Sequence, residues 1–160
     1  MQLSQWLMKT KAGSVYLVAS DLGLRGVYWN KQTVPFATSL KVDCPAVQIL
    51  AQSVGQLDEY FAGKRMEFDL PLDVQGTEFQ KSVWKALTKI PYGKTASYRD
   101  IAKKVKNENA SRAVGTANGK NPLCIIVPCH RVIASNGTLG GYSGGLHLKT
   151  QLLALEKSLA

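Results

Sequence analysis

Apolar residues in the first half of the chain follow strand-like and then helix-like spacing. Residues 15–19 and 24–29 are rich in apolar side chains and flank a short Asp-Leu-Gly turn, which predicts a β-hairpin. From residue 45 to 61 apolar side chains recur every three or four positions, as on one face of a helix, and Gly63 can end that helix. We therefore expect a hairpin followed by an amphipathic helix.

A polar connection then separates the two halves of the chain. A short strand over residues 66–70 is predicted to rejoin the sheet, and Pro71 and Gly76 bracket the segment that follows. Proline and glycine interrupt regular structure, so we place a domain boundary there. The sequence thus predicts two domains, residues 1–75 and 76–160.

Two capping signals mark helix starts in the second half. Thr77 and Gln80 have the spacing of a capping box, in which each side chain accepts a hydrogen bond from the other residue's backbone N–H. Apolar residues continue at helical spacing after this pair. Ser97 and Asp100 have the same spacing and predict the start of another helix.

A third short helix is predicted over residues 110–118, after a polar turn. Two short helices joined by such a turn resemble a helix-turn-helix, here at about residues 97–118. An apolar run over residues 123–127 is ended by Pro128, and a final helix is expected over residues 146–159. The predicted fold class is therefore mixed α/β (α+β), with strands in the first domain and mainly helices in the second.

Positive charge is concentrated in the second half of the chain. Residues 1–75 carry 7 Lys and Arg against 7 Asp and Glu, whereas residues 76–160 carry 13 against 4, so the whole net charge of +9 lies there. This is the charge pattern of a polyanion binder, because each neutralised phosphate releases counterions. A basic surface that serves only solubility is the alternative.

The sequence predicts neither a membrane protein nor a secreted one. No stretch approaches the roughly 18 consecutive apolar residues of a spanning helix, and the chain does not begin with a basic and then apolar segment. Three cysteines, Cys44, Cys124 and Cys129, include no CxxC pair, so no disulfide framework or zinc finger is indicated. Cys44 and Cys124 are most simply small buried hydrophobes. We expect a cytoplasmic protein.

Cys129 differs from the other cysteines in its neighbours. Pro128 precedes it and His130 and Arg131 follow, and positive charge beside a thiol favours the nucleophilic thiolate. On an extended strand, however, Cys129 and His130 would point to opposite faces, so a bend or a bridging water would have to join them. From these residues alone, a structural cysteine and a nucleophile stay equally open.

Glu156 is an acidic residue among apolar ones. On a helical projection it falls within the apolar arc of the final helix, so we expect its carboxylate to be at least half buried and to need a partner. A structural ion pair with Lys149 or Arg131 is one explanation. The other is that Glu156 orients the imidazole of His130, as the third member of a nucleophile, base and orienter set.

The glycine-rich segment 140–145 is a weak candidate for a phosphate-binding loop. It lacks the lysine and the serine or threonine order of a P-loop. Its glycines instead suit a close approach of the backbone to a flat ligand such as a base.

Several segments between residues 76 and 156 resemble one protein family. In order, they are 90–98 (IPYGKTASY), 112–119 (RAVGTANG), Asn121-Pro122, 128–132 (PCHRV) and 140–145 (GGYSGG). The set closely resembles the O6-alkylguanine-DNA alkyltransferases, whereas the first half matches that family mainly in length and pattern. The resemblance implies a small ribonuclease-H-like first domain without a catalytic role, followed by a domain that binds DNA and transfers the alkyl group.

The resemblance also implies roles for the chemical residues. Cys129 would accept the alkyl group, His130 would deprotonate it through a water, and Glu156 would hold His130. Tyr98 would donate a hydrogen bond to N3 of the flipped guanine, and Asn121 would brace the helix-turn-helix against the active-site strand. The thioether product has no evident route back to a thiol, so each molecule would act once.

Base recognition and DNA binding follow from the same resemblance. Ser143 would contact O6 of the base, the carbonyls of Cys129 and Val132 would bind its exocyclic amine, and Tyr142 would belong to the same site. A base inside a duplex hides its O6 substituent, so the enzyme must extrude it. The residues assigned to DNA binding are Arg112, Ala113, Thr95, Ser97 and Asn118.

Arg112 would fill the gap left by the extruded base. The small residues around it suit a close approach of the second helix to the minor groove. A simple phosphate contact by Arg112 is the alternative. The expected substrate is double-stranded DNA containing O6-alkylguanine, with O4-alkylthymine as a second one.

The sequence also departs from the family pattern. Residues 107–109 read Asn-Glu-Asn where many members carry a proline in the turn. Some members bind zinc in the first domain, but residues 1–75 hold Cys44 and no histidine, so we predict no metal and no cofactor. Cys129 is present, which argues against the related non-catalytic proteins with tryptophan there. We expect no membrane partner and a monomeric protein, with cooperative binding along DNA left open.

Two other classes of function stay open. A regulatory or damage-sensing DNA-binding module would use the same basic half and helix-turn-helix, with an incidental cysteine. A cysteine hydrolase would use Cys129, His130 and Glu156 to turn over an ester or amide. Uptake of an alkyl group by Cys129 distinguishes the alkyltransferase from both.

Overall fold

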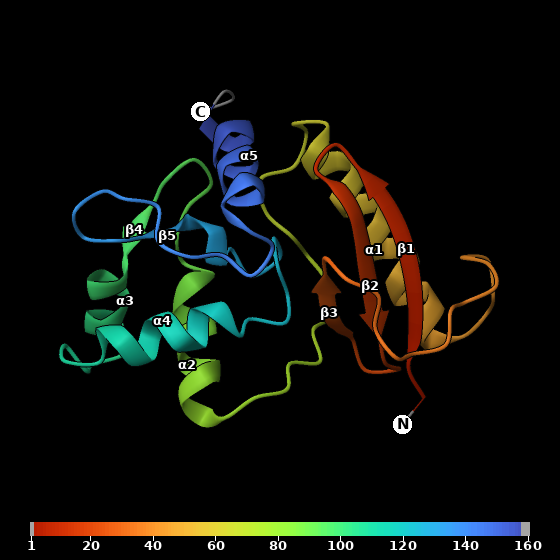
Figure 1. Cartoon of the computed structure of the whole chain (residues 1–160). Coiled ribbons are helices and arrows are strands. Elements are labelled where there is room, and N and C mark those ends of the chain that lie inside the picture. Colours follow the sequence, from red (N-terminus) through yellow and green to blue (C-terminus); the bar gives the residue numbers. More distant parts are fainter. Residues whose placement is uncertain (1, 158–160) are drawn as a thin grey trace. The chain divides into compact units, whose positions relative to one another are not determined.

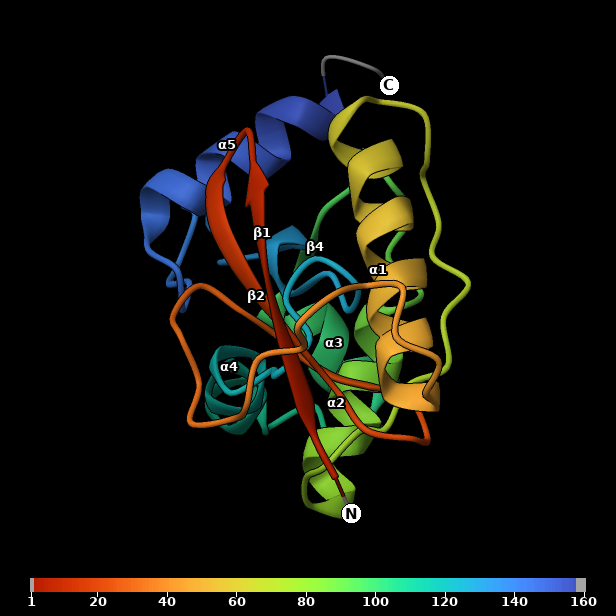
Figure 2. The same cartoon turned by 90° about the vertical axis from the view of Figure 1, so that its right-hand side faces the viewer.

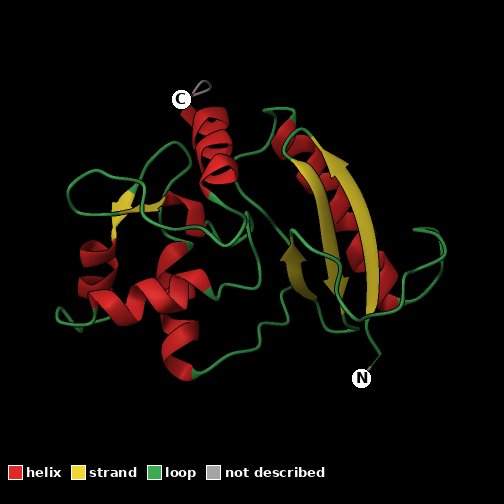
Figure 3. Ribbon diagram, in the orientation of Figure 1, coloured by secondary structure: helices red, strands yellow, loops and turns green. Residues whose placement is uncertain are grey.

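The chain divides into two compact units, Met1–Gln75 and Gly76–Ala160, of which this computed structural model describes residues 2–157. The larger strands belong to the first unit, and the second is mainly helical (Figure 3). This is the mixed α/β class that the sequence predicts. No helix within residues 2–157 is long and apolar enough to cross a membrane.

A three-stranded antiparallel sheet forms one layer of the first unit. β1 (Ser4–Thr10), β2 (Gly13–Ala19) and β3 (Leu24–Tyr28) pair in that order (Figure 1). β2 and β3 confirm the predicted hairpin, whereas β1 was not predicted. Its apolar pattern is broken by Gln5, which is fully buried. The Gln5 amide donates to the carbonyls of Gln32 and Val34 at 3.0 and 2.9 Å, which satisfies a polar group inside the unit.

The helix α1 (Pro45–Phe61) covers the sheet as the second layer. Figure 2 shows it running alongside β1 and β2, and it contacts all three strands. Its bounds are the predicted ones, with Cys44 as the residue before the first turn. Gly63 follows the helix at φ 75°, a left-handed conformation that glycine adopts without steric cost.

Residues 66–70 do not form the predicted strand. The Gln56 side chain of α1 bonds both backbone groups of Asp69, each at 2.9 Å, so these groups are not available to a sheet. The chain pairs with the edge of the sheet slightly later, at residues 71–73, which make two backbone hydrogen bonds of 2.8 and 2.9 Å with Leu24. The strand prediction was therefore wrong because a helix side chain satisfies the backbone there.

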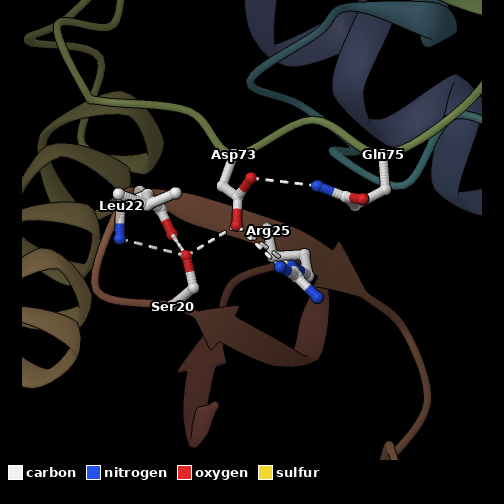
Figure 4. Close-up of polar contacts among 6 residues, drawn as sticks. Ser20, Leu22, Arg25, Asp73 and Gln75 are labelled. Atoms are coloured by element: carbon white, nitrogen blue, oxygen red, sulfur yellow. Dashed lines mark hydrogen bonds and ion pairs between the residues drawn. The ribbon is translucent and has the colours of Figure 1, made fainter. Parts of the chain in front are cut away.

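Asp73 fastens this segment to the sheet. Its carboxylate accepts hydrogen bonds from Ser20 Oγ at 2.6 Å, Arg25 Nη2 at 2.8 Å and Gln75 Nε2 at 3.0 Å (Figure 4). The hydrogen bond from Ser20, followed by that from Arg25, lowers the pKa of Asp73 below its ordinary value. The last residues of the first unit are thus held by an ionised carboxylate.

Within residues 76–157, four helices and a minimal parallel strand pair build the second unit. The helices are α2 (Glu78–Leu87), α3 (Tyr98–Lys104), α4 (Ser111–Gly119) and α5 (Leu146–Lys157), and β4 (Ala96–Ser97) pairs with β5 (Val132–Ile133). The strand pair was not predicted, since two residues leave no periodicity to detect. The predicted end of the last helix at residue 159 lies outside the described residues.

The predicted capping box forms at the start of α2, and a second one forms at the helix start predicted at Ser97. Gln80 N–H donates to Thr77 Oγ1 at 3.1 Å and Thr77 N–H donates to Gln80 Oε1 at 2.9 Å. Ser97 and Asp100 exchange the same pair of bonds, each at 3.0 Å. Because each box satisfies two backbone donors at a helix start, α2 and α3 begin where the sequence predicts.

α3 and α4 pack against each other as the two helices of the predicted helix-turn-helix. The turn between them needs no proline, because Lys106 adopts a left-handed φ of 60° and Asn107 N–H bonds the Ala102 carbonyl at 3.0 Å. α4 also packs on α2, where Trp84 Nε1 donates to the Ala117 carbonyl at 2.8 Å.

The apolar run and the cysteine motif after it form turns and not an extended strand. Val127 N–H bonds the Leu123 carbonyl at 2.8 Å, and Ile125 has a φ of 73°, an uncommon and strained value for a β-branched residue. A 3-10 turn, η1 (Cys129–Arg131), follows. Extended backbone begins at Val132, the last residue of the motif and the first of β5.

Candidate functional site

The turn η1 buries the side chains of Cys129, His130 and Arg131 inside the second unit. Cys129 is 2% exposed, His130 0% and Arg131 6%. Successive side chains on a 3-10 turn are about 120° apart, so the three point to different neighbours. A 3-10 turn therefore replaces the extended geometry that would place Cys129 and His130 on opposite faces.

Cys129 is surrounded by groups with opposing effects on its thiol. A contact with the Cys124 thiol, and then burial, raise the pKa of Cys129 well above its ordinary value. A hydrogen bond from the Asn121 amide and the positive charge of Lys149 act in the other direction. Cys129 is therefore a neutral thiol at rest, and a base is needed to make it a nucleophile.

Two asparagines brace the backbone around this thiol. Asn121 Nδ2 donates to the Val127 carbonyl at 2.8 Å, and its Oδ1 accepts from Leu123 N–H at 3.0 Å. Asn118, on α4, donates to the Cys129 carbonyl at 3.3 Å. The cysteine turn is thus tied directly to the second helix of the helix-turn-helix.

Glu156 joins His130 and Arg131 at one carboxylate. Its Oε2 lies 2.6 Å from His130 Nε2 and 3.0 Å from Arg131 Nη2, and its Oε1 accepts from Arg131 Nε at 2.8 Å. Arg131 also donates to the Ile90 carbonyl at 2.8 Å. The sequence left an ion pair and a histidine-orienting role as alternatives, and the structure contains both. Lys149, the other candidate partner, does not bond to Glu156.

The charges of this group are set by burial and hydrogen bonding. Burial raises the pKa of Glu156, but hydrogen bonds from His130 and Arg131 outweigh it and bring the value to about 2. Burial lowers the pKa of His130 despite the opposing effect of Glu156. At neutral pH the carboxylate is ionised and the imidazole is neutral.

This charge state defines the tautomer of His130. An ionised carboxylate is an acceptor, so His130 Nε2 carries the proton and donates it to Glu156. Nδ1 then holds a lone pair, and it has no hydrogen-bond partner among the described residues. Nδ1 is therefore the atom of His130 that can accept a proton.

Tyr98 and the glycine-rich segment lie together on another side of Cys129. Burial raises the pKa of Tyr98, a hydrogen bond from Gly141 N–H lowers it, and a thiolate at Cys129 would raise it further, so the phenol is neutral. Gly140 has a φ of 70°, and a Cβ atom there would lie 2.7 Å from the Tyr98 hydroxyl. The close approach of backbone to Tyr98 thus requires glycine at position 140.

Lys149 is a site residue that sequence reasoning assigned only as a possible partner of Glu156. Its side chain is fully buried, and Nζ donates to the Val132 carbonyl at 2.6 Å, the Gly141 carbonyl at 3.1 Å and the Leu139 carbonyl. Position 149 lies near the apolar arc of the last helix, which was the available signal for burial.

Of the remaining predicted residues of the base site, Ser143 and Tyr142 lie on the glycine-rich segment and Val132 lies on β5. Ser143 is exposed, and its Oγ is 3.6 Å from Cys124 Sγ. Tyr142 is half-buried beside it, and Val132 is fully buried. Within residues 2–157, no group of three or more His, Cys, Asp and Glu side chains could hold a metal ion.

The predicted DNA-binding residues fall into two groups. Arg112 and Ala113 are exposed at the start of α4, and Thr95 is exposed just before β4. Ser97 uses its hydroxyl to cap α3. Asn118 is 5% exposed and bonds Cys129, so its position favours a bracing role over contact with DNA.

An exposed helix-turn-helix in the same unit as a buried thiol, imidazole and carboxylate defines a DNA-binding class of protein with a cysteine site. Family comparison makes this specific. Residues 78–158 match the DNA binding domain, and residues 5–74 the ribonuclease-like domain, of 6-O-methylguanine DNA methyltransferase. The chain belongs to this family.

Curated relatives from archaea and bacteria carry one name, methylated-DNA–protein-cysteine methyltransferase. The protein of Methanosarcina acetivorans is 45% identical, covering 95% of this chain and 97% of its own. The protein of Mycobacterium bovis is 58% identical over 108 residues, which is 68% of this chain and 66% of that protein.

Solved structures agree with the fold. The crystal structure of Mycobacterium tuberculosis O6-methylguanine methyltransferase has a TM-score of 0.86 at 42% identity, covering 99% of this chain and 95% of that one. The structure of Mycobacterium tuberculosis OGT in complex with DNA also has a TM-score of 0.86, at 40% identity, covering 100% and 95%.

Proposed function

We propose that this chain repairs double-stranded DNA by transferring the alkyl group of O6-alkylguanine to the sulfur of its own Cys129. The observation that carries the proposal is a buried thiol beside a neutral imidazole whose other nitrogen is held by Glu156. Relatives up to 59% identical that are named methylated-DNA–protein-cysteine methyltransferases support the same activity.

The first step is removal of the thiol proton. The proton of Cys129 passes through a water to Nδ1 of His130, which has the lone pair to receive it. The resulting imidazolium keeps its Nε2–H bond to the ionised carboxylate of Glu156, which stabilises the new charge. Because the pKa of Cys129 is raised, the nucleophile forms mainly when this base is available.

The second step is an in-line displacement at the alkyl carbon. The S–C bond forms while the C–O6 bond breaks, and the electron pair of that bond stays with the purine. Tyr98, a neutral phenol next to Cys129, donates a hydrogen bond to N3 of the leaving guanine. Such a donor stabilises charge that develops as the bond breaks.

The base site uses backbone and side-chain groups around η1. Ser143 contacts O6, Tyr142 lies beside it, and the carbonyls of Cys129 and Val132 accept from the exocyclic amine. Asn118 and Lys149 already donate to these two carbonyls. A carbonyl oxygen has two lone pairs, so each can still accept from the base.

DNA binding is assigned to the exposed start of α4. Arg112 occupies the space of the extruded nucleotide, and Ala113 allows a close approach of α4 to the minor groove. Thr95 and Ser97 lie near the DNA backbone. Asn118 belongs to the brace that connects α4 to Cys129. A modified guanine pairs poorly, so its extrusion costs less than that of a normal base.

Other properties follow from this chemistry. The thioether is stable, so each molecule acts once, without a metal or cofactor, and O4-alkylthymine presents an equivalent alkyl carbon. Binding and transfer both belong to residues 76–160, and residues 1–75 take no catalytic part. We place the protein in the cytoplasm, because its three cysteines are free thiols, and we expect it to be a monomer.

Mass analysis of the protein after incubation tests the proposal. The chain is mixed with a duplex carrying one O6-methylguanine, and the peptide of residues 121–131, which contains both Cys124 and Cys129, is weighed and fragmented to locate the added mass. We expect one added methyl group on Cys129, and none on the neighbouring buried thiol of Cys124. Cys129→Ala should lose transfer but keep DNA binding, and Cys44→Ser, which removes a thiol of the first unit, is the matched control and should keep both. An unmodified wild-type protein would refute the proposal, and continuous turnover of an ester would favour a hydrolase.

A further inference from the structure

We propose that Lys149 is a positioning residue for this transfer: its buried ammonium holds the carbonyls of the base site and opposes the negative charge of the Cys129 thiolate. This inference rests on the proposed function and adds a residue to it. Two independent observations support it, the hydrogen bonds of Lys149 and the balance of buried charge around it.

The hydrogen bonds hold two separate segments. Lys149 Nζ donates to the carbonyl of Val132, at the start of β5, and to those of Leu139 and Gly141, on the glycine-rich side. An ammonium has three N–H donors, so all are used. One side chain thus fixes both the carbonyl proposed to bind the exocyclic amine and the backbone that contacts Tyr98.

Lys149 has no acidic partner within residues 2–157. Glu156 is the buried carboxylate of this unit, and its oxygens are occupied by His130 and Arg131. The ion pairs of the described residues do not include Lys149. A buried charge is costly without a counter-charge, and carbonyl groups compensate it without neutralising it.

The charge of Lys149 acts on the reacting groups. Burial lowers the pKa of Lys149, and the charge of Cys129 raises it. In return Lys149 lowers the pKa of both Cys129 and His130. Because Glu156 balances Arg131, the ammonium of Lys149 is the positive charge left to oppose a thiolate. The other titratable groups that face the thiol are Cys124 and Tyr98.

Thiol ionisation is measured without DNA, so this test does not depend on alkyl transfer. Cys44 and Cys124 are replaced by serine in every protein, leaving Cys129 as the single thiol, and its reaction rate with iodoacetamide is followed against pH. In Lys149→Met the midpoint of this pH profile should move to higher pH. The rate of reaction with iodoacetamide at neutral pH should fall about tenfold, since one pKa unit changes the thiolate fraction tenfold. Transfer from the O6-methylguanine duplex should fall by a similar factor or more.

Further variants separate charge from structural support. Lys149→Arg keeps the charge and should keep the midpoint, while Lys149→Gln keeps hydrogen-bond donors, loses the charge and should shift the midpoint as methionine does. Lys157→Met, an exposed lysine on the same helix, is the matched control and should change neither quantity. Urea unfolding and binding to undamaged duplex check that each variant is folded. If Lys149→Met does not fold, the comparison of Lys149→Arg with Lys149→Gln tests the role of the charge.

The outcomes are distinguishable. An unchanged midpoint in Lys149→Met and Lys149→Gln would overturn the electrostatic role, even if transfer became slower. A shifted midpoint with normal transfer would overturn the positioning role. If wild-type protein takes up no methyl group while the midpoint still shifts, the proposed function fails and the effect of Lys149 on the thiol stands.

Discussion

Glu156 Oε2 lies 2.6 Å from His130 Nε2, and the same carboxylate is bonded by two nitrogens of Arg131. One acid therefore does two things at once: it fixes the tautomer of the imidazole and it neutralises a buried guanidinium. Loss of the carboxylate would leave both His130 and Arg131 incompletely satisfied, so stability and chemistry are coupled at this residue.

Glu156→Gln should reduce both the free energy of unfolding and the rate of methyl transfer. The amide cannot neutralise Arg131, and breaking a buried ion pair costs about 3 to 5 kcal/mol. His130 also loses the carboxylate that stabilises its protonated form, so methyl transfer should slow about 100-fold, the scale of general-base catalysis. Urea unfolding at neutral pH and single-turnover transfer measure the two effects.

Glu108→Gln is the matched control for this change. Glu108 is an exposed carboxylate in the turn between α3 and α4. Its replacement should alter the free energy of unfolding by less than about 0.5 kcal/mol, as is usual for surface positions. Equal losses of unfolding free energy in the two variants would mean that the buried carboxylate of Glu156 stabilises the protein no more than an exposed one.

Acid should destabilise the protein in two steps. The pKa of His130 is lowered from 6.5 in the folded chain, so below pH 6.5 the unfolded chain binds more protons and stability falls. The pKa of Glu156 is about 2 against an ordinary 4.5, so a second loss develops as the pH falls from 4.5 towards 2. Urea unfolding across this range tests the prediction, and a stability independent of pH would contradict it.

Arg112→Ala should slow repair of duplex DNA more than reaction with a free base. The exposed side chain of Arg112 is proposed to stabilise the extruded state, which is absent when free O6-methylguanine is the substrate. A loss of about 1.4 kcal/mol corresponds to about a tenfold slower transfer from duplex. Arg99→Ala, an exposed arginine on α3, removes the same charge as a control. Equal losses on duplex and free base in Arg112→Ala would exclude the proposed role.

Gly140→Ala should disturb Tyr98. The new Cβ would lie 2.7 Å from the Tyr98 hydroxyl, and the φ of 70° at position 140 costs a non-glycine residue about 1 to 2 kcal/mol. We expect lower stability and slower transfer. Gly141→Ala is a close control, because a Cβ there meets nothing within 4 Å, and its effect on unfolding should stay within about 0.5 kcal/mol. Equal stability and equal transfer rates in the two variants would show that contact between residue 140 and Tyr98 affects neither quantity.

Local signals predicted much of the fold. The helix at 45–61 and the two capping boxes were visible because their spacing is set by the backbone geometry of a helix start and a helix face. The strand predicted at 66–70 failed because Gln56, thirteen residues before Asp69, takes its backbone hydrogen bonds. β1 was missed because a buried glutamine occupies an inward position.

By itself, the sequence determined the elements with strong local periodicity, the basic second half and the motif that contains Cys129. It left open whether Glu156 served Arg131 or His130, which tautomer His130 adopts and where the charge of Lys149 goes. Only the tertiary structure decided these, because they depend on hydrogen bonds between α5, η1 and the glycine-rich segment, and on burial that no single segment specifies. Local spacing encodes helices and caps, whereas the protonation state of a site depends on groups brought together from distant positions in the chain.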